Sequence, residues 1–80
     1  MDYSTAIDRI VRITKTRFST RNLRIVDATS HLRNDLGLDS LDRTELIFAM
    51  EDAFDIIIPD QDVDTLHTIC DIASYIEVHT

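Results

Sequence analysis

Residues 35–41, with the sequence DLGLDSL, form the segment of the chain best suited to a chemical function. Gly37 is the only glycine, which predicts either unusual backbone dihedral angles or a close approach at this point. Ser40 opens the strongest helical pattern, so its hydroxyl should lie near unpaired backbone N–H groups at the positive end of the helix dipole. A phosphate ester on this hydroxyl would be electrostatically favoured.

Ser40 has a simpler alternative role, in which Asp39 and Ser40 only cap the helix. No histidine or lysine lies near Ser40 in the sequence to act as a base, and an unactivated serine is a poor nucleophile. If Ser40 is chemically special, we therefore expect another enzyme to modify it. We predict no catalytic residue, and we expect that the chain is not an enzyme.

The residues that commonly bind metals do not form a recognisable site. The three histidines are far apart in sequence: His31, His67 and His79. Cys70 lies beside an apolar stripe, which is typical of a small buried side chain rather than a nucleophile. Residues 60–64 (DQDVD) resemble the start of a calcium loop, but Thr65 and Asp71 occupy the positions that require glycine and glutamate. We therefore predict no metal site.

The helix that follows Ser40 has an unusual outer face. In a helical projection with about 100° per residue, Leu41 and Phe48 lie roughly opposite the core position Leu46. Acidic side chains surround these two residues: Glu45, Glu51, Asp52 and Asp55. This combination is typical of a docking surface for a basic partner. In the alternative, the preceding loop folds over Phe48 and buries it.

Helices must position these residues, and the apolar spacing predicts where they lie. Residues 3–17 form the first helix, with apolar side chains at Tyr3, Ile7, Ile10, Val11 and Phe18. Residues 40–55 form the clearest helix, with Asp39 as N-cap and Asp42 as its capping-box partner. The core face of this helix comprises Leu46, Ala49, Met50, Ala53 and Phe54.

Two further helices are predicted after Pro59, which ends the extended connector formed by residues 56–58. Asp60 caps a short helix through Leu66, and a second capping box at Thr68 and Asp71 opens a last helix over 68–78. Residues 19–39 show no clean period and form a long first loop. Its scattered aliphatic residues predict that it is pinned across the bundle: Leu23, Ile25, Val26, Leu32, Leu36 and Leu38.

The composition agrees with one small helical domain over residues 1–80. Of the 80 residues, 44% are apolar, which suffices for a single core, and one glycine and one proline are too few for an all-β fold. With no leader and no apolar run near the ~20 residues of a membrane span, we expect neither a secreted nor a membrane-spanning protein. A single cysteine suits a reducing compartment, so we expect a cytoplasmic location and a monomer.

The net charge of −7 is divided unevenly. Residues 1–33 carry seven basic and three acidic side chains, or +4, whereas residues 34–80 carry one basic and twelve acidic side chains, or −11. The C-terminal part would repel a phosphate backbone, so no nucleic acid is expected as a partner. The basic residues of the N-terminal part are interpreted as a solvated helix face and loop.

Residues 35–46 (DLGLDSLDRTEL) closely resemble the attachment motif of the acyl carrier protein family, and residues 51–60 (EDAFDIIIPD) resemble the segment that follows it. The resemblance covers nearly the whole chain, including the first helix and residues 72–76. It implies an all-α four-helix bundle with a long first loop. It also implies that Ser40 receives 4′-phosphopantetheine from coenzyme A through a separate phosphopantetheinyl transferase.

The family resemblance further implies that the thiol of this arm carries acyl groups as thioesters to fatty-acid, lipid or polyketide-type enzymes with basic docking surfaces. The docking positions would be Asp39, Leu41, Glu45, Phe48, Glu51, Asp52 and Asp55. The lining of an enclosed acyl chain would be Leu46, Met50, Phe54, Leu66, Ile69 and Ala73. An aminoacyl or peptidyl carrier and an unmodified helical interaction module remain alternatives.

Three features depart from the family pattern. They are the basic N-terminal half, Arg43 within the docking helix, and Ile57 where a polar residue is common. We expect Arg43 to lie beside the docking face, where its charge is wrong for a purely basic partner surface.

Overall fold

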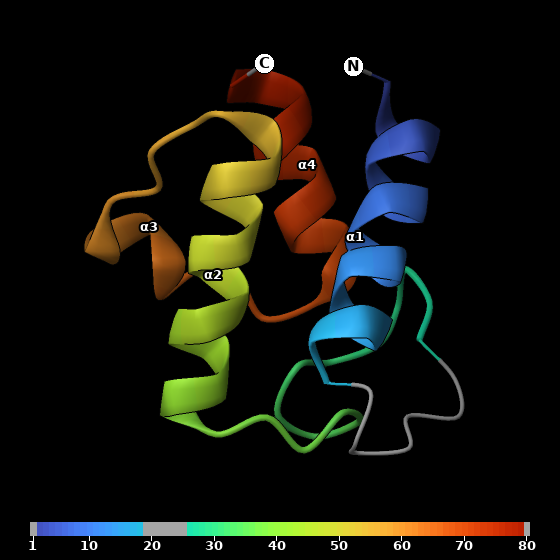
Figure 1. The fold of residues 1–80 in the computed structure, drawn as a ribbon, viewed down its shortest axis with the longest axis vertical. Coiled ribbons are helices and arrows are strands. Elements are labelled where there is room, and N and C mark those ends of the chain that lie inside the picture. Colours follow the sequence, from blue (N-terminus) through green and yellow to red (C-terminus); the bar gives the residue numbers. More distant parts are fainter. Residues whose placement is uncertain (1, 19–25, 80) are drawn as a thin grey trace.

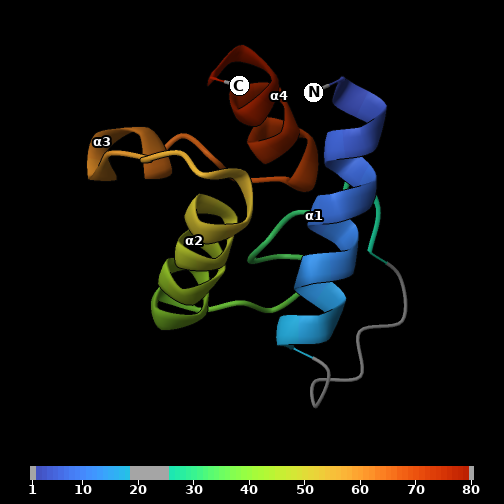
Figure 2. The same ribbon diagram turned by 45° about the horizontal axis from the view of Figure 1, so that its top comes forward.

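The computed structural model describes residues 2–18 and 26–79. In this part of the chain the helices follow the order α1 (Tyr3–Arg17), α2 (Ser40–Phe54), α3 (Asp60–Val63) and α4 (Ile69–His79). Helix α1 packs against α4 and, less extensively, against α2. Figures 1 and 2 show these three helices around the core, with the short α3 on the outer side of α2. The predicted all-α bundle of three main helices and one short helix is confirmed.

Helix α1 begins at the predicted residue because Asp2 caps it. The Asp2 carboxylate accepts the Thr5 N–H at 2.8 Å, and this bond lowers the pKa of the Asp2 carboxyl from its ordinary value. The helix buries Ala6 and Ile10 completely. Thr14 is also buried, and its hydroxyl donates to the Ile10 carbonyl at 2.8 Å, so burial leaves this polar group satisfied.

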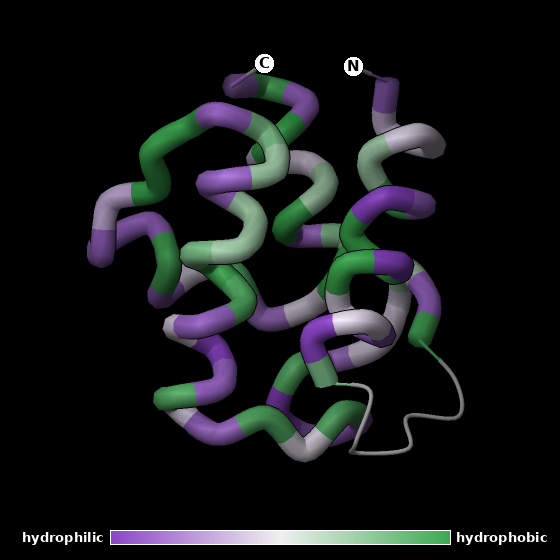
Figure 3. The backbone as a smooth tube through the Cα atoms, in the orientation of Figure 1, coloured by the Kyte–Doolittle hydropathy of each residue, from purple (hydrophilic) through white to green (hydrophobic). Residues whose placement is uncertain are grey.

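The first loop is pinned to the bundle as predicted, within the part that the structure describes. Its aliphatic side chains enter the core: Val26, Leu32, Leu36 and Leu38. The Leu32 N–H donates to the His67 carbonyl at 2.8 Å, and the Cys70 N–H donates to the Ala28 carbonyl at 2.9 Å. Figure 3 shows apolar and polar residues alternating along this loop. The predicted loop residues Leu23 and Ile25 lie outside the described residues.

The elements after α2 differ slightly from prediction. Helix α2 ends at a left-handed Asp55, with φ of 54°. The prediction that Asp60 caps a helix through Leu66 is wrong: Pro59 occupies the N-cap without a side-chain bond, and α3 ends at Val63. Proline fits this role because its fixed φ suits a helix start. Leu66 instead follows the helix as a core residue with 4% exposure.

The last helix begins with the predicted capping box. The Asp71 N–H donates to the Thr68 hydroxyl at 3.1 Å, and the Asp71 carboxylate accepts the Thr68 N–H at 3.2 Å. The helix then buries Ile69, Ile72 and Ala73 in the core, where α4 packs against α1. None of the described helices has the length and apolar character needed to cross a membrane.

Candidate functional site

The hydroxyl of Ser40 stands at the first residue of α2, on an exposed side chain. Asp39 performs the capping, since its carboxylate accepts the Asp42 N–H at 2.9 Å and its own N–H donates to the Asp42 carboxylate at 3.2 Å. Both halves of the predicted capping box are therefore present. Among the described residues, no hydrogen bond engages the Ser40 hydroxyl. The helix start thus does not depend on this side chain, which is accessible to a modifying enzyme.

Gly37 orients the segment that leads to Ser40. Its φ of 69° lies in the left-handed region, which confirms the predicted unusual backbone. A Cβ at this position would meet no atom within 4 Å, so the requirement for glycine comes from the dihedral angle rather than from crowding. The Gly37 N–H donates to the Arg33 carbonyl at 3.1 Å, and the next residue, Leu38, is buried. This turn lets the chain enter the core and emerge at Asp39.

The outer face of α2 is exposed as the helical projection predicted. Leu41 is 67% exposed and Phe48 is 62% exposed, so the alternative in which the loop buries Phe48 is wrong. Glu45, Asp52 and Asp55 are also exposed. We call Leu41, Phe48 and these three acidic residues the outer face of α2. Its apolar centre and acidic surroundings suit a partner with an apolar depression inside a basic rim.

Glu51 and Arg43 have structural contacts that the sequence did not reveal. The Glu51 carboxylate accepts the Ile58 N–H at 2.9 Å and is half-buried, so it holds the connector after α2. Arg43 is half-buried, and its guanidinium donates to the Val63 carbonyl at 3.0 Å. The expectation that Arg43 lies beside the docking face is therefore wrong. Its position, about 140° around the helix from Phe48, turns it toward α3.

The six predicted acyl-lining residues come together in the core. Leu46, Met50, Ile69 and Ala73 are completely buried, Leu66 is 4% exposed and Phe54 is 7% exposed. All six belong to a single apolar cluster. They therefore form the apolar interior of the bundle, and their role toward an acyl chain stays a prediction.

Two histidines that are distant in sequence meet in the fold. His31 and His67 stack with ring centroids 6.0 Å apart, beside a single β-bridge between His31 and Thr68. No local spacing could have indicated this pair. Cys70 is half-buried rather than enclosed, with its sulfur 3.1 Å from the Thr68 hydroxyl. In the described part of the chain, no group of three or more His, Cys, Asp or Glu side chains could hold a metal ion.

Comparisons with known proteins agree with this geometry. Residues 8–76 match the family model described as "Phosphopantetheine attachment site". An acyl carrier protein of Bdellovibrio bacteriovorus is 52% identical over 52 residues, which cover 65% of this chain and 67% of that protein. A mitochondrial acyl carrier protein of Neurospora crassa is 47% identical over 51 residues, or 64% of this chain and 38% of that protein.

A third relative aligns with more of the chain. A putative mitochondrial acyl carrier protein of Schizosaccharomyces pombe is 41% identical over 68 residues, which cover 85% of this chain and 61% of that protein. The family match includes α2 and its start, so it contains the exposed serine, its capping box and the outer face. The arm of this family is 4′-phosphopantetheine, and an exposed hydroxyl at a helix start fits such an attachment. The chain therefore belongs to the acyl carrier protein family.

Proposed function

We propose that Ser40 carries the 4′-phosphopantetheine arm and that this chain delivers acyl groups held as thioesters on the thiol of the arm. The observation that supports this assignment is that the residues which cap α2 are different from the serine at its first position. Asp39 and Asp42 cap the helix, while the neighbouring Ser40 side chain is exposed. Its hydroxyl lies at the positive end of the helix dipole, which stabilises an attached phosphate.

A separate transferase must supply the base for the modification. Residues 32–66 contain neither histidine nor lysine, and serine needs a base to become a nucleophile. In the transfer, the bond between the serine oxygen and phosphorus forms while the pyrophosphate bond of coenzyme A breaks. Adenosine 3′,5′-bisphosphate leaves, and the hydroxyl proton passes to the transferase. The chain itself contributes position and charge rather than catalysis.

Intact-mass analysis tests the attachment site. After incubation with coenzyme A and a broad-specificity phosphopantetheinyl transferase, we expect the wild-type chain to gain one phosphopantetheine. Ser40→Ala should gain none and should retain its helical content, because the capping box does not use Ser40. Ser4→Ala, which removes an exposed serine from α1, is the matched control and should load like wild type. A Ser40→Ala chain that still gains the arm would refute the assignment, and an unmodified wild-type chain would favour an interaction module.

The outer face of α2 is proposed as the docking surface for the transferase and for acyl-transferring enzymes. Its exposed carboxylates should accelerate association with basic surfaces, and Leu41 and Phe48 should provide the apolar contact. Asp39 and Glu51 border this face, but both carboxylates also accept backbone hydrogen bonds. We further propose a monomer in the cytoplasm. Light scattering and cell fractionation test these two points, and a mitochondrial signal would contradict the second.

A further inference from the structure

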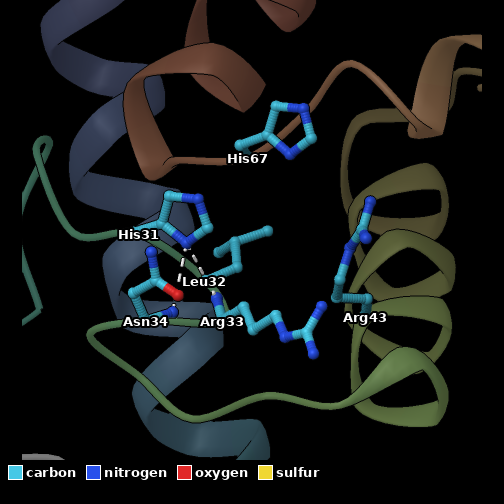
Figure 4. Close-up of a pocket in the computed structure, with 6 residues that line it drawn as sticks. All are labelled: His31, Leu32, Arg33, Asn34, Arg43 and His67. Atoms are coloured by element: carbon cyan, nitrogen blue, oxygen red, sulfur yellow. Dashed lines mark hydrogen bonds between the residues drawn. The ribbon is translucent and has the colours of Figure 1, made fainter.

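A cavity of about 450 Å³ lies between the first loop, the segment before α4 and the flank of α2 (Figure 4). This volume is within the range of about 300–1,000 Å³ that is typical of small-molecule sites. The cavity is lined by His31, Leu32, Arg33, Asn34, Arg43 and His67. Four of these six side chains are basic and none is acidic. The lining combines His31 and Arg33 from the basic segment 1–33 with Arg43, which is the single arginine of residues 34–80.

The carboxylates that contact the two cavity histidines accept backbone N–H groups and do not line the cavity. Asp35 accepts the His31 N–H at 2.7 Å, and Asp71 accepts the His67 N–H at 3.0 Å. Each carboxylate therefore positions one of the two stacked histidines without lining the space that they border. The positive charge of the arginines is thus not neutralised by an acidic side chain in the cavity wall.

The basic side chains offer donors of defined orientation. His31 Nδ1 accepts the N–H groups of Arg33 and Asn34, at 3.2 and 3.1 Å, which assigns the ring proton of the neutral form to Nε2. The bond from Arg43 to Val63 occupies one of the five donors of a guanidinium group. Figure 4 shows the Arg33 side chain extending toward Arg43 across the lower part of the cavity. Guanidinium groups favour a carboxylate or phosphate as their ligand.

One residue of the cavity lining, Arg43, lies within one helical turn of the proposed attachment point. Arg43 follows Ser40 by three residues, which corresponds to about 4.5 Å along the axis of α2 and about 60° around it. A group attached to Ser40 therefore starts on the same flank of the helix as the arginine that borders the cavity.

We propose that this cavity binds the terminal carboxylate of an acyl group carried on the arm, so that the chain favours cargo that ends in an acid. The inference rests on the proposed function, because the arm brings the cargo to the cavity. The volume exceeds what a single phosphate group requires, and the two arginine and two histidine side chains in the lining suit an anionic terminus better than an alkyl terminus. A plain alkyl chain would instead enter the buried apolar cluster of the core.

Nuclear magnetic resonance of the 80-residue chain in four forms tests the proposal. The forms are unmodified, loaded with the bare arm, loaded with a butyryl arm and loaded with a glutaryl arm, each verified by intact mass. We expect the glutaryl form alone to shift the Arg33 and Asn34 amides and the His67 ring. Arg33→Gln should weaken this occupancy about tenfold, the factor that corresponds to about 1.4 kcal/mol. Arg33 is exposed, so this variant should remain folded.

Arg12→Gln is the matched control, since it removes an exposed arginine that does not line the cavity and should leave the glutaryl shifts unchanged. Equal shifts in all three loaded forms would overturn the proposal in favour of the phosphate of the arm. Unshifted cavity resonances in a fully loaded glutaryl chain would overturn it without affecting the carrier assignment. A chain that gains no arm would refute the proposed function, and this inference with it.

Discussion

Replacing Phe48 by alanine should weaken partner binding without unfolding the bundle. Phe48 is 62% exposed and stands outside the buried cluster, so its removal leaves no core cavity. We therefore expect the free energy of unfolding to change by less than about 0.5 kcal/mol. Phe54→Ala serves as the comparison, because Phe54 is 7% exposed. Its replacement should cost about 3–5 kcal/mol of folding free energy, so the two variants distinguish an effect on docking from an effect on stability.

The expected loss in binding follows from the area that Phe48 leaves open. A phenylalanine buries about 150–250 Å² when fully enclosed. With 62% of Phe48 exposed, about 90–155 Å² remains for a partner to cover. At about 25 cal/mol per Å², full coverage would contribute about 2–4 kcal/mol. Because alanine keeps part of this contact and partners rarely enclose a residue completely, we expect a loss of about 1–3 kcal/mol.

Binding kinetics against the transferase that loads the chain provide the assay. Dissociation of Phe48→Ala should accelerate about 5- to 150-fold, with little change in association, because the outer-face charges remain. Val78→Ala removes an apolar side chain of similar exposure, 77%, from α4 and should behave like wild type. Wild-type kinetics for Phe48→Ala with every partner tested would refute the docking surface.

Two further predictions concern stability. Moderate salt should raise the melting temperature, because the acidic side chains of residues 34–80, with a net charge of −11, repel one another and salt screens this repulsion. A melting temperature independent of ionic strength at neutral pH would contradict this prediction. Glu51→Ala should destabilise the fold by about 1–2 kcal/mol in denaturant unfolding, because the Ile58 N–H loses its acceptor, while Glu51→Gln keeps an acceptor oxygen and should lose less. If Glu51→Ala leaves stability unchanged but slows association with a partner, its role is in docking.

Local patterns in the sequence were sufficient to predict the helices and the environment of Ser40. Helical periodicity and capping depend on residues three or four positions apart, so α1, the start of α2 and the Thr68–Asp71 capping box could all be predicted. The single glycine likewise indicated the unusual backbone at Gly37, because its special dihedral angles are a property of the residue itself.

Contacts between distant segments could not be predicted in this way. Arg43 reaches the Val63 carbonyl 20 residues away, and this bond turns it from the expected docking position toward α3. His31 and His67 meet only because the first loop pairs with the segment before α4, which forms the basic cavity. The exposure of Phe48 also depends on where the loop runs, since a helical projection shows direction but not what covers a face. Tertiary packing decided these points, because they rest on hydrogen bonds and contacts that no local period encodes.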